Sequence, residues 1–189
     1  KYYDITKRIR PWGTTDAICC LLGNVNEPFI LVNSDDIYGE DAFRQGYRYL
    51  HTTSNNMIGV SYLKNTISGK ELINRGIVEL QENKNRVTSL KETLDINVEK
   101  NPEYLEKMCN VNFLCLQPFV LKELNKILIK FKEQHVDNNK IEALLPDHLN
   151  YLIKHKYIDL GYFVINDTII SLTYPSDVDK VKDFIKNNM

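Results

Sequence analysis

The chain has 189 residues, of which 43% are hydrophobic and 26% are charged, and these values are ordinary for a globular domain. Its 24 Lys and Arg residues nearly balance its 25 Asp and Glu residues, so the net charge of -1 gives no general attraction to nucleic acid or to an acidic membrane. The sequence shows no membrane-spanning run and no signal peptide, so we expect a cytoplasmic protein. Residues 1–189 are enough for one domain.

Helical and strand patterns alternate along the chain, beginning with a turn at Pro11–Thr15 and a buried helix over about residues 16–23. A helix over about residues 41–50 has an apolar stripe of Phe43, Tyr47 and Leu50. The later strands are expected over residues 57–63, 76–80, 86–90, 109–116, 157–165 and 168–172. The later helices are expected over residues 119–134, about 141–154 with a break or restart at Pro146, and at the carboxyl end.

Two of these pairs of strands are predicted to form hairpins. In the first hairpin, the polar segment 81–85 joins the strands 76–80 and 86–90. In the second hairpin, Asn166-Asp167 joins the strands 157–165 and 168–172. Strands mixed with helices in this order predict an α/β domain with a mixed, mostly parallel sheet flanked by helices.

The stretch from Phe29 to Val32 is a continuous apolar run, which predicts a short strand covered on both faces at the centre of a parallel sheet. Asp35 and Asp36 follow it after the two polar residues Asn33 and Ser34. In open α/β sheets ligands bind beyond the carboxyl ends of strands, so these carboxylates stand where a hard cation and a phosphate could be held. The alternative is turn chemistry, in which the Asp side chains bond the backbone and cap the next helix.

Cysteine and histidine residues give no sign of a metal site. The four cysteines lie in apolar segments without a CxxC spacing, as expected for small buried side chains in a reducing compartment: Cys19, Cys20, Cys109 and Cys115. The four histidines show no ligand spacing with a cysteine or a carboxylate, and we expect them at the surface: His51, His135, His148 and His155.

Several short motifs occur in an order that resembles the sugar-phosphate nucleotidylyltransferases, a family with a glycosyltransferase-A-like fold. The motifs are Pro11-Trp12-Gly13-Thr14, Glu27-Pro28-Phe29 running to Asp35-Asp36-Ile37-Tyr38-Gly39, Asn74-Arg75-Gly76-Ile77, Ser89-Leu90-Lys91-Glu92-Thr93, the strand Asn110 to Leu116, and Glu142-Ala143-Leu144-Leu145-Pro146. The resemblance covers nearly the whole chain. It implies transfer of a nucleotidyl group from a nucleoside triphosphate to a sugar 1-phosphate, or a similar phosphomonoester, with release of pyrophosphate and with Mg²⁺ as the cofactor.

The resemblance also implies roles for residues near the amino end. Asp35 matches the Mg²⁺-binding catalytic Asp, and Asp36 is expected to cap the next helix rather than to bind through water. Gly13 and Thr14 match the loop that meets the nucleotide base, where a glycine lets the backbone approach a planar ring. An ordinary helix-capping turn is the alternative for this loop.

Four further residues match the substrate-binding part of the family. Gly76 matches a glycine whose backbone approaches the sugar, and Glu92 matches a carboxylate that accepts sugar hydroxyls. Asn110 or Asn112 matches a polar position that faces the sugar, and the resemblance does not decide between them. The alternatives are a solvated surface position for Glu92 and a buried, backbone-bonded role for the asparagines.

The sequence departs from the family pattern in three places. No two glycines are close enough to form the Gly-rich loop that wraps the triphosphate, Ser171 stands where a second metal-binding carboxylate is expected, and Asp16 adds a negative charge to the base loop. We therefore expect an amino-terminally incomplete domain that corresponds to a carboxyl-terminal portion and is inactive alone. The alternative is a non-catalytic binding or regulatory module. An exposed sheet edge would favour a homo-oligomer.

Overall fold

The computed structural model describes residues 8–66, 72–172 and 175–188. Its helices are α1 (Thr14–Cys19), α2 (Glu40–Thr52), α3 (Phe119–Gln134), α4 (Leu145–Lys154) and α5 (Val178–Asn188). Its strands are β1 (Phe29–Leu31), β2 (Asp36–Ile37), β3 (Asn56–Tyr62), β4 (Ile73–Gln81), β5 (Arg86–Ile96), β6 (Met108–Leu116), β7 (Leu160–Val164) and β8 (Ile170–Ser171). No helix in these ranges is long and apolar enough to cross a membrane.

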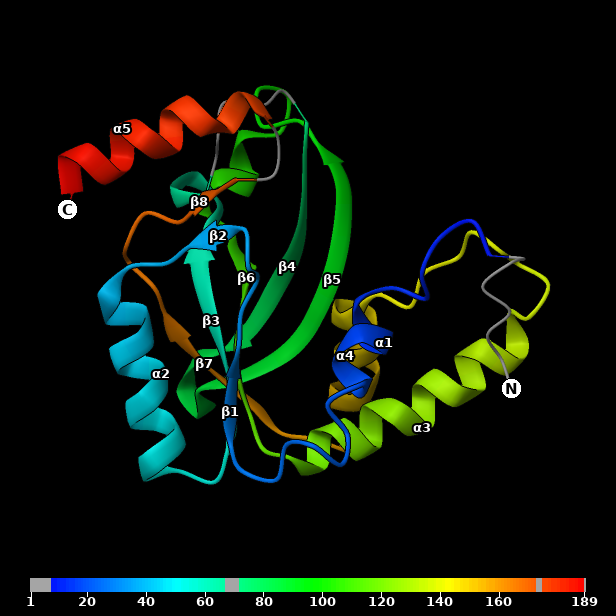
Figure 1. Cartoon of the computed structure of the whole chain (residues 1–189). Coiled ribbons are helices and arrows are strands. Elements are labelled where there is room, and N and C mark those ends of the chain that lie inside the picture. Colours follow the sequence, from blue (N-terminus) through cyan, green and yellow to red (C-terminus); the bar gives the residue numbers. More distant parts are fainter. Residues whose placement is uncertain (1–7, 67–71, 173–174, 189) are drawn as a thin grey trace.

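The main sheet is six-stranded and lies between α2 on one side and α1, α3 and α4 on the other (Figure 1). Its order is β5-β4-β6-β3-β7, and β1 pairs with β6 outside this path. The predicted α/β class with a mixed sheet is confirmed. The share of parallel strand pairs is lower than expected for a mostly parallel sheet. Among the described pairings β3–β7 is parallel, whereas β6 runs antiparallel to β1, β3 and β4.

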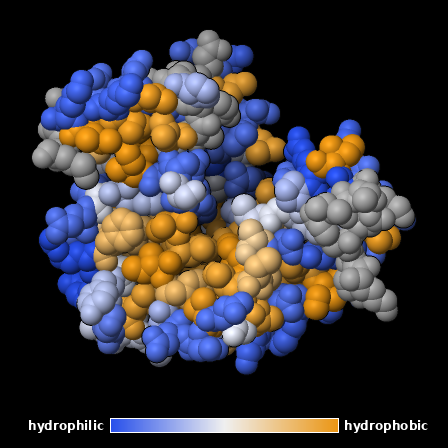
Figure 2. Space-filling view, in the orientation of Figure 1, coloured by the Kyte–Doolittle hydropathy of each residue, from blue (hydrophilic) through white to orange (hydrophobic). Residues whose placement is uncertain are grey.

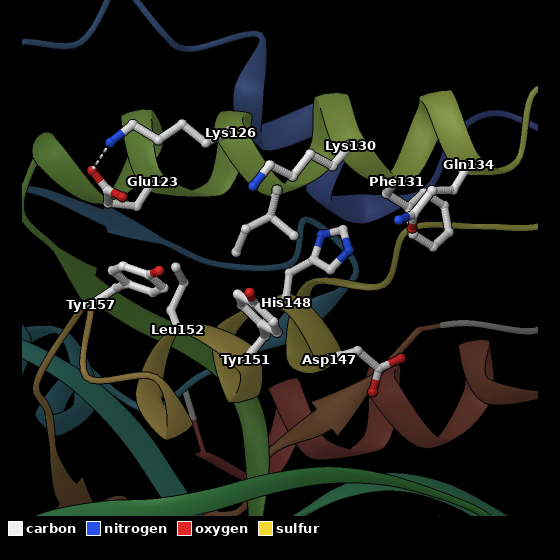
Figure 3. A pocket seen from close by; sticks show the side chains of 11 residues that line it. Glu123, Lys126, Lys130, Phe131, Gln134, Asp147, His148, Tyr151, Leu152 and Tyr157 are labelled. Carbon is white, nitrogen blue, oxygen red and sulfur yellow. Dashed lines mark hydrogen bonds and ion pairs between the residues drawn. The ribbon is translucent and has the colours of Figure 1, made fainter.

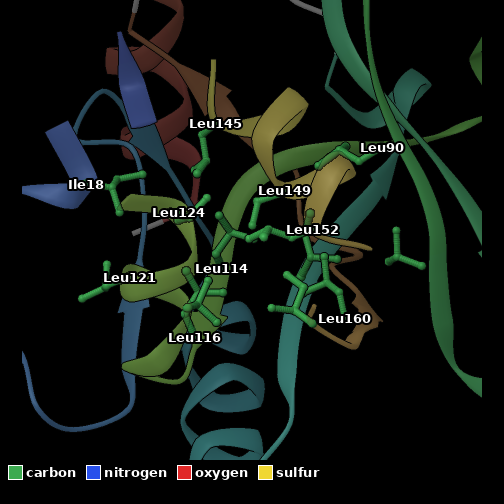
Figure 4. Close-up of a cluster of buried hydrophobic side chains, with 14 of the residues drawn as sticks. Ile18, Leu90, Leu114, Leu116, Leu121, Leu124, Leu145, Leu149, Leu152 and Leu160 are labelled. Atoms are coloured by element: carbon green, nitrogen blue, oxygen red, sulfur yellow. The ribbon is translucent and has the colours of Figure 1, made fainter. Parts of the chain in front are cut away.

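Strand β6 is buried on both faces, and its alternating side chains serve two separate cores. Phe113 and Cys115 belong to the core beneath α2, whereas Leu114 and Leu116 belong to the core beneath α1, α3 and α4. Figure 4 shows leucines of α3, α4, β6 and β7 gathered in this second core together with Ile18 of α1. The two cores hold the helices in place on either face of the sheet.

The long helix and the first hairpin follow the sequence pattern closely. Helix α3 has the predicted bounds, and its buried residues are Val120, Leu121, Leu124 and Leu128. Helix α4 begins at Leu145, so Pro146 lies in its first turn, where a proline is tolerated. Strands β4 and β5 pair antiparallel across a short turn, which confirms the first predicted hairpin.

The second predicted hairpin is wrong. Strand β7 pairs with β3 in the main sheet, and β8 pairs with β2 in a separate two-stranded sheet. The segment around Asn166-Asp167 therefore connects two sheets. The turn signal in the sequence is real, but the strands on either side of it find other partners.

The predicted place of β1 is also wrong in part. Phe29 and Leu31 pack on one core and Ile30 and Val32 on the other, so the apolar run is covered on both faces, as expected. However, β1 is only half-buried, runs antiparallel to β6 and pairs with no second strand in the described ranges. It therefore lies at an edge and not at the centre of a parallel sheet.

Three side-chain predictions need correction. Phe43 and Tyr47 of the predicted stripe on α2 are exposed, and Ala42 and Gly46 face the sheet instead, because Phe113 leaves no room for a side chain at Gly46. Cys20 is exposed, whereas the other three cysteines are buried. His148 is 7% exposed and therefore belongs to the interior, unlike the surface position predicted from the sequence.

Candidate functional site

A cavity of about 570 Å³ lies beyond the carboxyl end of β1, between the sheet and helices α1 and α4. We call it the strand-end cavity. Four of the seven predicted site residues line it, and they come from four separate segments: Thr14, Asp35, Glu92 and Asn112. Most of the other lining residues are apolar, among them Ile18, Leu31, Leu94, Leu114 and Leu145. Figure 2 shows hydrophobic residues gathered around the hollowed centre of this face.

A smaller pocket of about 190 Å³ adjoins the strand-end cavity, and we call it the side pocket. The two share Asn33, Asp35 and Asn112 in their linings. Asp36 and Arg75 are among the further residues that line the side pocket. Arg75 is the single cationic side chain among the described lining residues of the two cavities.

Asp35 lies where the two cavities meet. It is exposed and is separated from the end of β1 at Leu31 by residues 32–34, and its backbone oxygen accepts a hydrogen bond of 2.7 Å from the Leu172 amide. This bond fixes the backbone of the loop. Within the described ranges its carboxylate has neither a hydrogen bond nor an ion pair. The carboxylate oxygens therefore remain available to a ligand.

Asp36 does not cap α2, contrary to the prediction. Its carboxylate accepts hydrogen bonds from Asn33 Nδ2 at 3.0 Å, from the Tyr38 hydroxyl at 3.3 Å and from the Ser171 hydroxyl. The physical reason is that the chain first forms β2, which pairs with β8, before α2 begins at Glu40. Burial and the charge of Asp36 raise the pKa of Tyr38, so its hydroxyl stays protonated and keeps donating.

Asn110 and Asn112 form a reciprocal pair at an irregularity of β6. The Asn112 amide donates to Asn110 Oδ1 at 2.8 Å, and Asn110 Nδ2 donates to Asn112 Oδ1 at 3.1 Å. Asn112 has a φ of 56°, a left-handed conformation that asparagine tolerates better than most residues. Asn112 lines both cavities, whereas Asn110 is buried and lines the side pocket alone. The buried, backbone-bonded alternative therefore fits Asn110, and Asn112 is the better candidate for a ligand contact.

Glu92 faces the strand-end cavity from β5, opposite Gly76 on β4. A side chain on Gly76 would come within 3.5 Å of the Glu92 carboxylate and 3.2 Å of Leu90. Gly76 does not itself line either cavity. Burial, followed by the charge of Asp147, raises the pKa of Glu92, while Arg75 acts in the opposite direction.

This raised pKa predicts a pH-dependent effect of the substitution Glu92→Gln. In the folded state Glu92 has a pKa above its ordinary value of 4.5, so the folded protein binds more protons than the unfolded one between the two values. Stability is therefore lost as pH rises through that window. Glu92→Gln removes this pH-dependent loss. We therefore expect the free energy of unfolding of Glu92→Gln, relative to that of wild type, to be higher at pH 7 than at pH 4 when both are measured by urea unfolding.

The matched control for this experiment is Glu79→Gln, which changes an exposed carboxylate on the neighbouring strand β4. We expect its difference from wild type to be the same at both pH values. A Glu92→Gln difference that is also independent of pH would contradict the half-buried position of the Glu92 side chain.

Gly13 and Thr14 hold the loop before α1 against the segment before α4. The Ala143 amide donates to the Trp12 oxygen at 2.6 Å, and Thr14 Oγ1 accepts from the Leu145 amide at 2.9 Å. Gly13 has a φ of 98°, and a side chain there would meet the Ala143 oxygen at 2.8 Å. Gly13 therefore supports the cavity without lining it, whereas Thr14 lines it and also accepts a hydrogen bond from the first residue of α4.

Sequence reasoning gave no role to several polar lining residues and misplaced one other residue. Asn33, Asn74 and Arg75 line the cavities but received no role, although Asn74 and Arg75 lie in a motif that carries the family resemblance. Asp16 does not add charge to the cavity. Its carboxylate is paired with Lys132 Nζ at 2.5 Å, between α1 and α3.

The donor set suits Mg²⁺ better than a metal held by protein ligands alone. In the described ranges no group of three or more His, Cys, Asp or Glu side chains is placed to hold a metal. Mg²⁺ commonly binds through one or two carboxylates together with substrate phosphates and water. Asp35, with Asp36 beside it in the side pocket, fits this requirement.

Comparison with solved structures finds the same fold in proteins that transfer nucleotidyl groups. A protein from Bacillus anthracis that is described as a putative glucose-1-phosphate thymidylyltransferase has a TM-score of 0.67 at 9% identity, over 96% of this chain and 64% of its own length. UDP-glucose pyrophosphorylase in complex with UDP-glucose has a TM-score of 0.61 at 16% identity, over 96% and 65%. Inositol-1-phosphate CTP transferase from T. maritima has a TM-score of 0.59 at 14% identity, over 93% and 62%.

Sequence comparison adds no relative to these structures. No protein-family model matches the chain, and no curated protein sequence matches it significantly. At identities of 9–16% the likeness concerns the fold. The chain therefore has the fold of the sugar-phosphate nucleotidyltransferases, as its motifs indicated, and spans slightly less than two thirds of the length of these structures.

Proposed function

We propose that this protein takes part in nucleotidyl transfer from a nucleoside triphosphate to a sugar 1-phosphate, or a similar phosphomonoester, with release of pyrophosphate. One observation carries the proposal. Thr14, Asp35, Glu92 and Asn112 are distant in sequence and line a single cavity at the end of β1. The fold shared with nucleotidyl-transferring proteins supports the same conclusion.

The lining of the strand-end cavity fits a sugar. Apolar side chains such as Leu31 and Leu114 offer a surface to the apolar face of a sugar ring. The Glu92 carboxylate can accept hydrogen bonds from hydroxyls, and the Asn112 amide can both accept and donate. A few convergent polar groups in an otherwise apolar cavity are typical of small-molecule sites.

The reaction needs little covalent chemistry from the protein. An oxygen of the acceptor phosphate attacks the α-phosphorus in line, the bond from this phosphorus to the bridging oxygen breaks, and pyrophosphate leaves with the electron pair. Mg²⁺ held by Asp35 would neutralise the charge that develops on the phosphate oxygens. Asp35 and Arg75 would thus orient the reacting phosphates, and orientation is a large part of such catalysis.

We assign the acceptor part of the site and one Mg²⁺ ligand to this chain. Its sequence contains no Gly-rich loop for the triphosphate, so we propose that this loop belongs to another part of the complete protein and that the chain alone is inactive. In the part of the chain that the structure describes, β1 pairs with β6 alone, and this supports a homo-oligomer as a second proposal, because a free strand edge favours association.

The test is pyrophosphate release by the full-length protein with each of the four ribonucleoside triphosphates and a panel of sugar 1-phosphates. With the substrate pair that works, we expect Glu92→Gln to raise KM for the sugar phosphate about tenfold or more, because a hydrogen bond to a charged group is lost. We expect kcat to change less. Glu79→Gln on β4 serves as the control and should leave both values unchanged.

Two outcomes would contradict the proposal. If Glu92→Gln and Glu79→Gln have the same KM, the sugar phosphate does not occupy the strand-end cavity. If the full-length protein binds a sugar phosphate but releases no pyrophosphate with any triphosphate, the protein is a non-catalytic binding module.

A further inference from the structure

A second cavity of about 570 Å³ lies between α3 and α4, on the other side of α4 from the strand-end cavity. We call it the α3–α4 pocket. Its volume is within the range of small-molecule sites. Leu145 and Pro146 at the start of α4 line the strand-end cavity, whereas His148, Tyr151 and Leu152 of the same helix line the α3–α4 pocket. The nucleotidyl-transfer proposal uses none of these three residues.

Three aromatic residues and a histidine line the α3–α4 pocket, beside charged and aliphatic side chains. Phe131 of α3 contacts His148 edge to face, with 5.3 Å between ring centroids. Tyr151 and Tyr157 are 41% and 55% exposed, and their rings are nearly parallel with centroids 6.4 Å apart. Exposed aromatic rings around an apolar floor favour a flat ring as the ligand.

His148 is the polar group that the fold leaves unsatisfied in this pocket. It is 93% buried, and its Nδ1 has no hydrogen-bond partner within the described ranges. Burial lowers its pKa, so the imidazole is neutral at pH 7. A buried polar atom without a partner is rare in folded proteins and calls for an explanation, such as a bound ion or a functional role.

The charges of the α3–α4 pocket leave one cation available. Lys126 is paired with Glu123 at 2.7 Å, whereas Lys130 makes no ion pair with any residue in the described ranges. Figure 3 shows Lys130 lying over the pocket, His148 and Tyr151 extending from α4 toward α3, and the Asp147 carboxylate turned away from Lys130. An anionic group on the ligand would therefore meet Lys130.

We propose that the α3–α4 pocket binds a flat aromatic molecule that carries one anionic group, with the ring against Tyr151 and Phe131 and the anion at Lys130. A nucleoside monophosphate and a simple aryl phosphate share this chemistry. The site is separate from the strand-end cavity, so the proposal does not depend on nucleotidyl transfer. Because α4 lines both cavities, a ligand here would contact the helix that shapes the strand-end cavity.

The test is a titration of the ¹⁵N-labelled protein with phenyl phosphate, AMP and inorganic phosphate, followed by amide chemical shifts. We expect phenyl phosphate or AMP to shift amides of α3 and α4, and inorganic phosphate to bind more weakly. Saturating shifts by phenyl phosphate alone would identify an aryl phosphate site, and tighter binding of AMP would identify a nucleotide site. Shifts confined to α1, β1 and β5 would place the ligand in the strand-end cavity and overturn the proposal.

Matched variants test the two contacts separately. Lys130→Gln should weaken phenyl phosphate binding about tenfold, because a charged partner is lost, whereas Lys122→Gln, an exposed lysine of α3 outside the pocket, should not. Tyr151→Leu should weaken it about threefold to tenfold, because a ring contact is lost.

Tyr47→Leu is the control for Tyr151→Leu. Tyr47 stacks on His51 with centroids 3.9 Å apart, and Tyr151 stacks on His155 at the same separation, so both variants remove a similar helix-surface contact. Equal affinity of wild type, Lys130→Gln and Tyr151→Leu, with all variants folded by their amide spectra, would overturn the proposal.

Discussion

Replacing Asp35 by Asn is expected to lower kcat/KM for nucleotidyl transfer by roughly 10²–10³-fold in the full-length protein, a loss typical of removing one electrostatic partner of the reacting group. The amide keeps the size of the side chain but loses the negative charge that Mg²⁺ requires. The folded state should be little affected, because the Asp35 carboxylate has no partner within the described ranges and its structural bond to Leu172 uses the backbone oxygen.

The measurement is the rate of pyrophosphate release as a function of Mg²⁺ concentration. In Asp35→Asn the Mg²⁺ concentration for half-maximal rate should rise, which a purely structural role would not produce. Asp137→Asn, an exposed carboxylate in the segment after α3, is the control and should behave like wild type. An unchanged rate and Mg²⁺ dependence in Asp35→Asn would exclude Asp35 as the metal ligand.

The substitution Gly13→Ala is expected to destabilise the protein by about 3 kcal/mol, through backbone strain and overpacking together. Gly13 has a φ of 98° and a ψ of -174°, a combination that is almost restricted to glycine. In addition, the new methyl group would meet the Ala143 backbone, with 2.8 Å to its oxygen and 2.9 Å to its nitrogen. Backbone atoms cannot move aside as a flexible side chain can.

Gly23→Ala separates these two causes. Gly23 also has a positive φ, of 86°, but no atom lies within 4 Å of a methyl group placed there. We expect this control to destabilise the protein by about 1 kcal/mol, the strain contribution alone. Both values can be measured by urea unfolding. Equal destabilisation by the two substitutions would show that the Gly13 loop does not pack tightly on Ala143.

Some features were predictable because they depend on neighbours in the sequence. Apolar spacing alone predicted α3 with its bounds, and a polar turn between two strand patterns predicted the β4–β5 hairpin. The place of Asp35 shortly after a strand was likewise visible, and the structure puts it in the lining of a cavity. Each of these depends on local periodicity or turn chemistry, which a sequence displays directly.

Other features depended on partners far away in the chain. The strands on either side of Asn166-Asp167 pair with β3 and β2, and nothing within residues 157–172 reveals this choice. The position of His148 at the interface of two helices likewise follows from how α3 and α4 pack. Similarly, Asp36 became a partner of Ser171 because two short strands meet across 135 residues of sequence.

Local pattern thus established most helices and strands, the α/β class and the acid at the end of β1. Long-range pairing decided which residues meet. It brought Glu92 and Asn112 to Asp35, left β1 at an edge and gave Asn110 a supporting role. The physical reason is that a hydrophobic period records which face of an element is buried, whereas the partner of that face is chosen by packing over the whole chain.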